Sequence, residues 1–76
     1  MLTGAQIRAG RALARWSARE LAERAEIGLN TVQRLEAVDD VPNSTARTLA
    51  AIQRALEAAG VAFTANGVEL ARKEAS

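Results

Sequence analysis

The feature that most constrains this fold is a pair of short predicted helices, over residues 18–25 and 29–38, joined by a tight connection. Ser17 followed by Glu20 has the form of a capping box, which marks the start of the first helix. Its end is less sharply marked, because Glu26 stands where a glycine would usually stop a helix. The positions expected to point inward are small or aliphatic, as two closely crossing helices require: Leu21, Ala22, Ala25, Ile27, Val32 and Leu35.

A third helix is predicted before this pair, over residues 4–15. Thr3 followed by Gln6 is another capping box, and it places the start of the helix near Gly4. The helical period then repeats apolar residues on one side of the segment. The side chains expected to face the core are Ile7, Leu13 and Ala14.

A fourth and longest helix is predicted over residues 45–59. It follows a break at Pro42, because proline cannot continue a helix and restricts the residue before it. Asn43 or Ser44 is expected to cap it, and Gly60 is expected to end it. Its inward stripe has a clean spacing of three and four residues: Leu49, Ile52 and Leu56.

After Gly60 the apolar residues alternate as they do in a strand. Asn66-Gly67 interrupts the alternation and is the strongest short signal for a two-residue hairpin turn. The register that follows pairs Ala65 with Val68, Thr64 with Glu69, and Phe63 with Leu70. A hairpin of this size is marginal in water, so we expect it to pack on the fourth helix or to pair its edge with a second copy. Its apolar face would consist of Val61, Phe63, Val68 and Leu70.

Composition excludes several classes of function. The chain has 76 residues, enough for one domain, and contains neither cysteine nor histidine. Disulfides, thiolate metal sites and the commonest general base are therefore excluded, and we expect no enzyme, metal or cofactor. No apolar run reaches the roughly 18 residues of a membrane span, and no signal-peptide pattern opens the chain, so we expect a cytoplasmic protein without membrane contact. So short a chain leaves no room for a separate effector domain, and no small-molecule effector is evident.

The net charge of +1 taken alone argues against a dedicated nucleic-acid binder. The distribution of charge is more favourable for DNA binding, because residues 1–38 contain six arginines and four glutamates. Nine of the ten basic residues are arginine, which suits bidentate contacts to phosphate or guanine. A GC-rich coding sequence would produce the same bias toward arginine.

The segment LAERAEIGLNTVQRLE, residues 21–36, resembles the signature of Cro/C1-type (Xre family) helix-turn-helix regulators, and the resemblance extends over about residues 5–59. It implies a mainly α, lambda repressor-like domain of four helices over residues 1–60. The alternating pattern after Gly60 adds a C-terminal β-hairpin over residues 61–72, and we expect a flexible tail over residues 73–76. The implied function is sequence-specific binding of double-stranded DNA by a transcriptional regulator. We expect a repressor that acts as a homodimer on a pseudo-palindromic operator.

The resemblance also assigns roles to single residues. It implies base contacts from Leu29, Asn30, Gln33 and Arg34, and phosphate contacts from Thr31, Asn43, Ser44 and Arg47. Side-chain chemistry agrees, since carboxamides pair with adenine and guanidinium groups with guanine. Ser17 is first a cap and secondarily a phosphate contact, and three arginines are further phosphate partners: Arg8, Arg15 and Arg19. The resemblance implies in addition a pair of Arg11 with Glu36, which we interpret as structural.

Several positions depart from the family pattern. Glu26 replaces a turn glycine, and Asp40 stands where a glycine or asparagine often follows the recognition helix. Gly28 replaces the serine or threonine that usually caps that helix. Ala18 stands where a glutamine often touches phosphate, and Trp16 takes the place of a leucine, which we interpret as packing.

The added acids favour an alternative: a protein–protein module, antitoxin-like or an adaptor, on a helix-turn-helix scaffold. In the main interpretation, the predicted dimerisation residues are those of the hairpin: Val61, Phe63, Val68 and Leu70.

Overall fold

A computed structural model of the chain describes residues 2–65 and 67–70. The described part is mainly helical, with four helices and a small C-terminal antiparallel hairpin, as the sequence predicts. The elements are α1 (Gly4–Leu13), α2 (Ala18–Ala25), α3 (Leu29–Glu36), α4 (Ala46–Ala58), β1 (Val61–Phe63) and β2 (Val68–Leu70). The tail predicted over residues 73–76 lies outside the described residues. No described helix is both long enough and apolar enough to cross a membrane.

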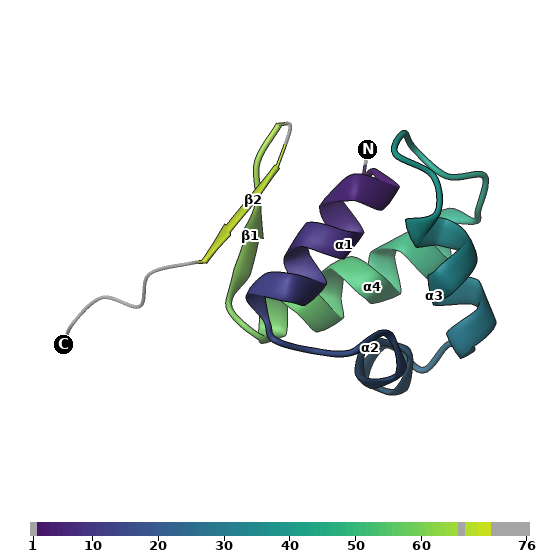
Figure 1. Cartoon of the computed structure of the whole chain (residues 1–76), viewed down its shortest axis with the longest axis horizontal. Helices are drawn as coiled ribbons and strands as arrows, with labels where there is room; N and C mark the ends of the chain where they lie inside the picture. The colour runs from purple at the N-terminus through teal and green to yellow at the C-terminus, as the bar shows by residue number, and fades with distance from the viewer. Residues whose placement is uncertain (1, 66, 71–76) are drawn as a thin grey trace, which may run out of the picture.

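In Figure 1, α1 crosses in front of α4 in the middle of the molecule. The helices α2 and α3 lie at one end, and the hairpin of β1 and β2 lies at the other. The hydrophobic core runs between these parts, since all four helices and β1 contribute side chains to it. Its fully buried large side chains are Ile7, Leu21, Val32, Leu35, Ile52, Leu56 and Val61. The two ends of the molecule are therefore joined through a single core.

The helix ends follow the predicted caps with three differences. The capping box of Thr3 and Gln6 is confirmed, with both of its backbone–side-chain bonds at 3.0 Å. The helix α1 ends at Leu13, two residues early, because Arg15 adopts a left-handed conformation with φ 61°. The prediction that Asn43 or Ser44 caps α4 is wrong: Thr45 is the cap, and its hydroxyl accepts the amide of Thr48 at 3.2 Å. The helix α3 ends at Glu36 rather than near residue 38.

The capping box predicted before α2 is only half formed. The Ser17 hydroxyl accepts the backbone N–H of Glu20 at 3.0 Å, as a helix cap should. The Glu20 carboxylate binds Arg24 at 2.7 Å, one turn further along the helix. The cap is therefore a serine cap, combined with an i,i+4 ion pair on the exposed side of α2.

The predicted hairpin register is wrong by two residues. The structure pairs Val61 with Leu70, Ala62 with Glu69, and Phe63 with Val68, so the loop spans residues 64–67 and is four residues long. A shift of two keeps every side chain on its predicted face, because side chains in a strand alternate with a period of two. The longer loop is stabilised by Thr64, whose amide donates to the Gly67 carbonyl at 2.9 Å and whose hydroxyl accepts the Gly67 amide at 2.9 Å.

The hairpin packs on its own chain. Val61 is 2% exposed, and Phe63 and Val68 are partly buried against the core, whereas Leu70 is 57% exposed. Strand β1 contacts α1 and α4, and β2 contacts α1. Gly10 makes this approach possible, because a Cβ there would lie 3.1 Å from a Leu56 methyl group and 3.4 Å from a Val61 methyl group.

Candidate nucleic-acid interface

The connection between α2 and α3 is three residues long and contains no glycine at its left-handed position. Glu26 takes that position with φ 60° and ψ 44°. A residue with a Cβ pays roughly 1 kcal/mol for this conformation. The turn is closed by the amide of Ile27, which donates to the Ala22 carbonyl at 3.0 Å. In Figure 1, α2 is seen end-on while α3 lies across the view, so the two helices cross rather than run parallel.

The helix α3 has one buried face and one exposed face. Val32 and Leu35 are fully buried, and Glu36 is 7% exposed. The opposite face carries three of the four predicted base-contacting residues, which are all exposed: Asn30, Gln33 and Arg34. The fourth, Leu29, is partly buried and packs against the core. Three polar side chains with i, i+3 and i+4 spacing therefore point away from the molecule together.

Arg34 also contacts the loop that leads to α4. One of its terminal nitrogens donates to the backbone carbonyl of Asn43 at 3.2 Å. A guanidinium group has five N–H donors, so this bond leaves most of them free for a ligand. Arg34 thus links the exposed face of α3 to the segment that holds two predicted phosphate contacts, Asn43 and Ser44.

Six of the predicted phosphate-contacting residues lie at the N-terminal ends of three helices. Ser17 caps α2 and Arg19 lies in its first turn, while Thr31 lies in the first turn of α3. The others precede or begin α4: Asn43, Ser44 and Arg47. Ser17, Arg19, Asn43 and Arg47 are exposed, and Thr31 and Ser44 are partly buried. Helix N-termini carry unpaired N–H groups and partial positive charge, which favour anions.

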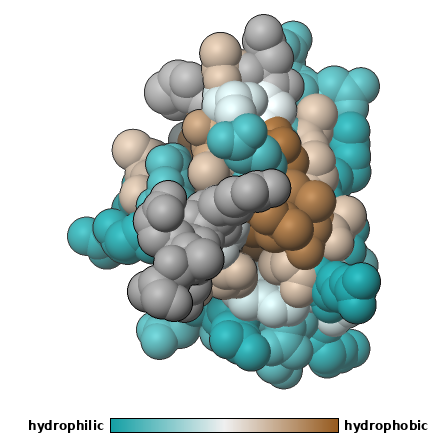
Figure 2. Space-filling model, turned by 90° about the vertical axis from the view of Figure 1, so that its left-hand side faces the viewer, coloured by the Kyte–Doolittle hydropathy of each residue, from teal (hydrophilic) through white to brown (hydrophobic). Residues whose placement is uncertain are grey.

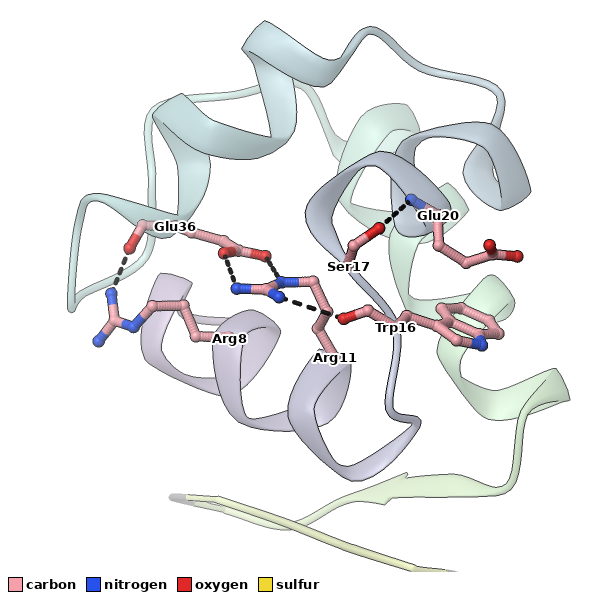
Figure 3. A network of polar contacts seen from close by, with 6 residues as sticks. All are labelled: Arg8, Arg11, Trp16, Ser17, Glu20 and Glu36. Atoms are coloured by element: carbon pink, nitrogen blue, oxygen red, sulfur yellow. Dashed lines mark hydrogen bonds and ion pairs between the residues drawn. The ribbon is translucent and has the colours of Figure 1, made fainter.

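The predicted pair of Arg11 and Glu36 is confirmed, and it is bidentate (Figure 3). The two nitrogen–oxygen distances are 2.8 and 3.0 Å, and Arg11 also donates to the Trp16 carbonyl at 3.2 Å. The hydrogen bond to Glu36 raises the pKa of Arg11 above its ordinary value, against the opposing effect of burial. Arg11 therefore connects the end of α3 to the segment that enters α2.

Arg8 holds the same end of α3 from one turn earlier on α1. It donates to the Glu36 backbone carbonyl, as Figure 3 shows, and pairs with the exposed carboxylate of Asp39 at 2.6 Å. Sequence reasoning proposed Arg8 as a phosphate partner, and the structure shows it already engaged with an acid. The pair partly neutralises one of the two aspartates that follow α3.

Trp16 packs as the sequence predicts, with a partner that the sequence did not indicate. It is partly buried against the core, and the Arg24 guanidinium lies 4.9 Å from its ring centroid. Such cation–π contacts are worth about 0.5–1 kcal/mol at exposed sites. Only the fold of the segment between α1 and α2 brings these two residues together.

Sequence reasoning missed the role of Gly4 in placing α3. A Cβ at this position would lie 1.8 Å from the Val38 carbonyl oxygen and 2.4 Å from the Leu35 carbonyl oxygen. The Gly4 amide also donates to the Asp40 carbonyl at 3.0 Å. The start of α1 therefore packs directly against the end of α3, and only glycine fits there.

The second missed residue is Gln6. It is 5% exposed, and its side-chain amide donates to the carbonyls of Thr64 and Gly67 at 2.8 and 3.1 Å. The capping box identified Gln6 only as part of a local motif. The spacing of Thr3 and Gln6 cannot indicate the contact with the hairpin, because the partners of Gln6 there lie about sixty residues away along the chain.

The chain matches no protein-family model, and no curated protein matches it. Within residues 2–65 and 67–70, no group of three acidic, histidine or cysteine side chains could hold a metal ion. The geometry of α2 and α3 is therefore the main guide to function.

Proposed function

We propose that this chain is a sequence-specific, duplex-DNA-binding transcriptional regulator of the Cro/C1 (Xre) kind, with a lambda repressor-like fold. The observation that carries the proposal is α3. Its inner face is buried in the core, while Asn30, Gln33 and Arg34 stand together on its outer face. A short helix braced by a crossing helix, with polar residues outward, is the arrangement that places side chains in the major groove.

In this proposal α3 reads base edges. Asn30 and Gln33 carry carboxamides, which pair with adenine through two hydrogen bonds, and Arg34 pairs with guanine. Ser17, Arg19 and the other residues at helix N-termini bind phosphates and set the position of α3 in the groove. The chain acts as a binding protein rather than as an enzyme.

Two copies on one operator are needed for useful specificity. The helix α3 has eight residues and is therefore about 12 Å long, which is enough for only a few base pairs. A pseudo-palindromic site with half-sites one helical turn apart doubles the number of bases that are read. Bound at a promoter, such a dimer acts as a repressor by excluding the transcription machinery.

A single copy is expected to bind weakly. Glu26 and Asp40 are exposed and place negative charge near the proposed DNA-facing side. Ala18 offers no polar group where α2 begins. The two acids repel a polyanion and Ala18 adds no contact to it, which makes pairing of two copies more important.

The salt dependence of duplex binding tests the proposal. Binding to a fluorescent duplex pool is measured by anisotropy as the salt concentration rises from about 25 to 200 mM. A DNA-binding protein releases phosphate counterions, so its affinity should fall linearly on a log–log plot. Absence of binding at the lowest salt, with any sequence pool, would contradict the proposal.

Selection from a random duplex library then identifies base contacts. Gln33→Ala or Arg34→Ala should relax base preference at one position of each half-site, with a loss of about 1–3 kcal/mol for the preferred base. Arg54→Ala is the matched control for Arg34→Ala, because Arg54 is an exposed arginine on α4 outside the proposed contacts. If Arg34→Ala weakens all sequences equally, Arg34 contacts only the DNA backbone.

The exposed acids favour a second candidate, a protein–protein module of antitoxin or adaptor type on the same scaffold. Glu23, Glu26 and Asp40 are all exposed around α2 and α3. A surface that binds a basic protein partner would keep these charges, whereas a strong DNA-binding surface would not. The salt series separates the two candidates, since the module has no reason to bind duplex at any salt concentration.

A further inference from the structure

Arg34 differs from the other proposed base contacts because a hydrogen bond already holds its side chain. Its Nη1 nitrogen donates to the main-chain carbonyl of Asn43 at 3.2 Å. Asn30 and Gln33 are exposed on the same face of α3, and their side chains make no hydrogen bond within residues 2–65 and 67–70. An arginine side chain loses rotamer freedom when it binds a base. A bond that orders Arg34 in advance makes that loss smaller.

The nitrogen that donates to Asn43 leaves the opposite edge of the guanidinium group free. Nη1 lies on the side of this planar group away from the Nε–H, whereas Nε and Nη2 donate in parallel from the other side. Two parallel N–H donors match the O6 and N7 acceptors that guanine presents in the major groove. Arg34 can therefore keep its bond to Asn43 and bind guanine through Nε and Nη2 at the same time.

The carbonyl that accepts this bond belongs to a loop whose position is set from outside α3. The loop consists of residues 37–45, between α3 and α4. The Asp40 carbonyl accepts the Gly4 amide at 3.0 Å, which attaches the first half of the loop to the start of α1. Pro42, directly before Asn43, is buried, and its ring fixes the φ angle of the backbone there. A buried and rigid residue therefore precedes the carbonyl that holds Arg34.

The two ends of the molecule offer different surfaces to a polyanion. The face that carries the hairpin shows a hydrophobic patch (Figure 2). At the other end, Asn30, Gln33 and Arg34 are exposed together beside the loop. Phosphates and base edges are bound by polar and cationic groups rather than by a continuous apolar surface. The bond between Arg34 and Asn43 therefore lies at the end of the molecule that suits DNA.

We propose that the loop between α3 and α4 positions Arg34 to read one guanine in each half-site. Pro42 is the positioning residue, the main-chain carbonyl of Asn43 is the acceptor, and Nε and Nη2 of Arg34 bind the base. The inference rests on the proposed DNA binding and adds to it the edge of the guanidinium group that reads the base. Specificity at this base pair then depends on a residue that lies outside the recognition helix.

NMR relaxation of arginine Nε–H groups tests the positioning without DNA. The Nε–H of Arg34 should be more ordered than that of Arg54, an exposed arginine on α4 without a side-chain hydrogen bond in the described residues. Pro42→Ala removes the rigid, buried ring and should lower the order of Arg34 to that of Arg54. Val41→Ala is the matched control, because Val41 lies in the same loop and is 42% exposed, and it should leave Arg34 unchanged. Circular dichroism checks that both variants fold.

Selection from a random duplex library tests the effect on specificity. Pro42→Ala should lower the preference for guanine at the position assigned to Arg34 by about three- to tenfold, because the contact is loosened rather than removed. The preferences at the positions read by Asn30 and Gln33 should stay the same. A residue that only stabilised the fold would instead weaken binding to all sequences equally, and Val41→Ala should select the same bases as the wild type.

Two results would overturn the proposal even if the chain binds DNA. The first is a wild-type Arg34 that is no more ordered than Arg54, which needs no variant to be measured. The second is a folded Pro42→Ala protein that keeps its guanine preference, or that loses preference equally at every position. Absence of duplex binding in the salt series would contradict the proposed function and the guanine contact together. Because the order of Arg34 is measured without DNA, the two failures are distinguishable.

Discussion

The α2–α3 unit and the β1–β2 hairpin are both built from short elements, but they are stabilised differently. Each of the two helices has eight residues, and three of them are buried. The strands have three residues each, and Val61 is the one fully buried side chain that they contribute within the described residues. The hairpin depends in addition on the Gln6 amide, which binds both sides of its loop.

This difference shows which parts of the chain encode their structure locally. The presence of α2 and α3 follows from the Ser17 cap and from apolar spacing within about twenty residues of sequence. The hairpin register follows from a contact with α1, at the other end of the chain. We therefore expect the α2–α3 unit to unfold only with the whole domain, and the hairpin to open at a lower free energy.

The largest expected effect breaks the α2–α3 unit. Leu35→Ala removes a fully buried side chain from α3 and should lower the free energy of unfolding by about 3 kcal/mol. Leu70→Ala is the matched change in the hairpin, and it should cost less than about 0.5 kcal/mol because the side chain is exposed. Urea unfolding of dilute protein measures both. Similar losses for the two variants would contradict the proposed difference between the regions.

The next largest effect concerns the link between α1 and α3. Glu36→Gln removes the charge of a buried carboxylate and leaves Arg11 without its partner, at a cost of about 2 kcal/mol. Glu20→Gln breaks the ion pair on the exposed side of α2 and should cost less than about 0.5 kcal/mol. Chemical denaturation of both variants measures the contrast. Equal effects would show that burial adds nothing to the Arg11–Glu36 pair.

The direction of the Arg11 pKa shift predicts the pH range over which this pair keeps its full contribution to stability. Because the folded-state pKa of Arg11 is raised, its contribution is fully present below the pKa of the guanidinium in the unfolded chain and is lost only as the pH rises through the folded-state pKa, in strongly alkaline solution. The stability difference between wild type and Arg11→Met should therefore stay constant from about pH 7 to pH 10. Stability curves at several pH values test this. A difference that shrinks in that range would mean that Arg11 is not the titrating partner.

A smaller effect should fall on the hairpin and on the capping box at the start of α1, which both depend on Gln6. Gln6→Ala removes two hydrogen bonds to the hairpin loop and should cost about 1 kcal/mol. Hydrogen exchange should become faster at Ala62 and Glu69, while the amides of α3 keep their protection. Gln53→Ala is the control, because within the described residues the Gln53 side chain bonds to Glu57 on its own helix and not to the hairpin backbone. Faster exchange in α3 would show that the hairpin and α3 unfold as one unit.

Much of the fold could be predicted from local sequence signals. The four helices, the capping box at Thr3 and the inward residues of α2 and α3 all follow from patterns within a few turns. The hairpin was predicted with the correct faces and the wrong register. Asn66-Gly67 favours a two-residue turn, but the Thr64 hydroxyl and the Gln6 amide stabilise a four-residue loop. Long-range hydrogen bonds of this kind are invisible to local propensity.

The candidate site shows the same division. The exposed side of α3 follows from helical spacing, so Asn30 and Gln33 could be placed from the sequence. The fit of Gly4 against the Val38 carbonyl could not, because a glycine at a helix start has many other causes. The ion pair of Arg8 with Asp39 could not be predicted either, since no local spacing in the sequence links these two residues. Where tertiary packing determines a contact, a local pattern can identify one of the residues but not the residue that it contacts.

The smallest expected effect is a gain in stability at the start of α3. Gly28 caps α3 in an extended conformation, with φ −73° and ψ 148°, and makes no side-chain hydrogen bond. A Cβ there would meet only the Thr31 hydroxyl, at 3.9 Å, so a larger residue fits without strain. Gly28→Ser should supply the missing acceptor for an amide in the first turn and raise the free energy of unfolding by about 0.5 kcal/mol.

Gly28→Ala separates the cap from the loss of a flexible glycine. Alanine restricts the unfolded chain in a similar way but has no hydroxyl, so any stabilisation by serine beyond that of alanine belongs to the hydrogen bond. Thermal melting of the three proteins measures the difference. Exchange rates in the hairpin should be the same in all three, because a local cap at α3 does not reach Gln6. If the Gly28→Ser and Gly28→Ala proteins are equally stable, a side-chain cap does not stabilise α3, and packing alone determines where the helix starts.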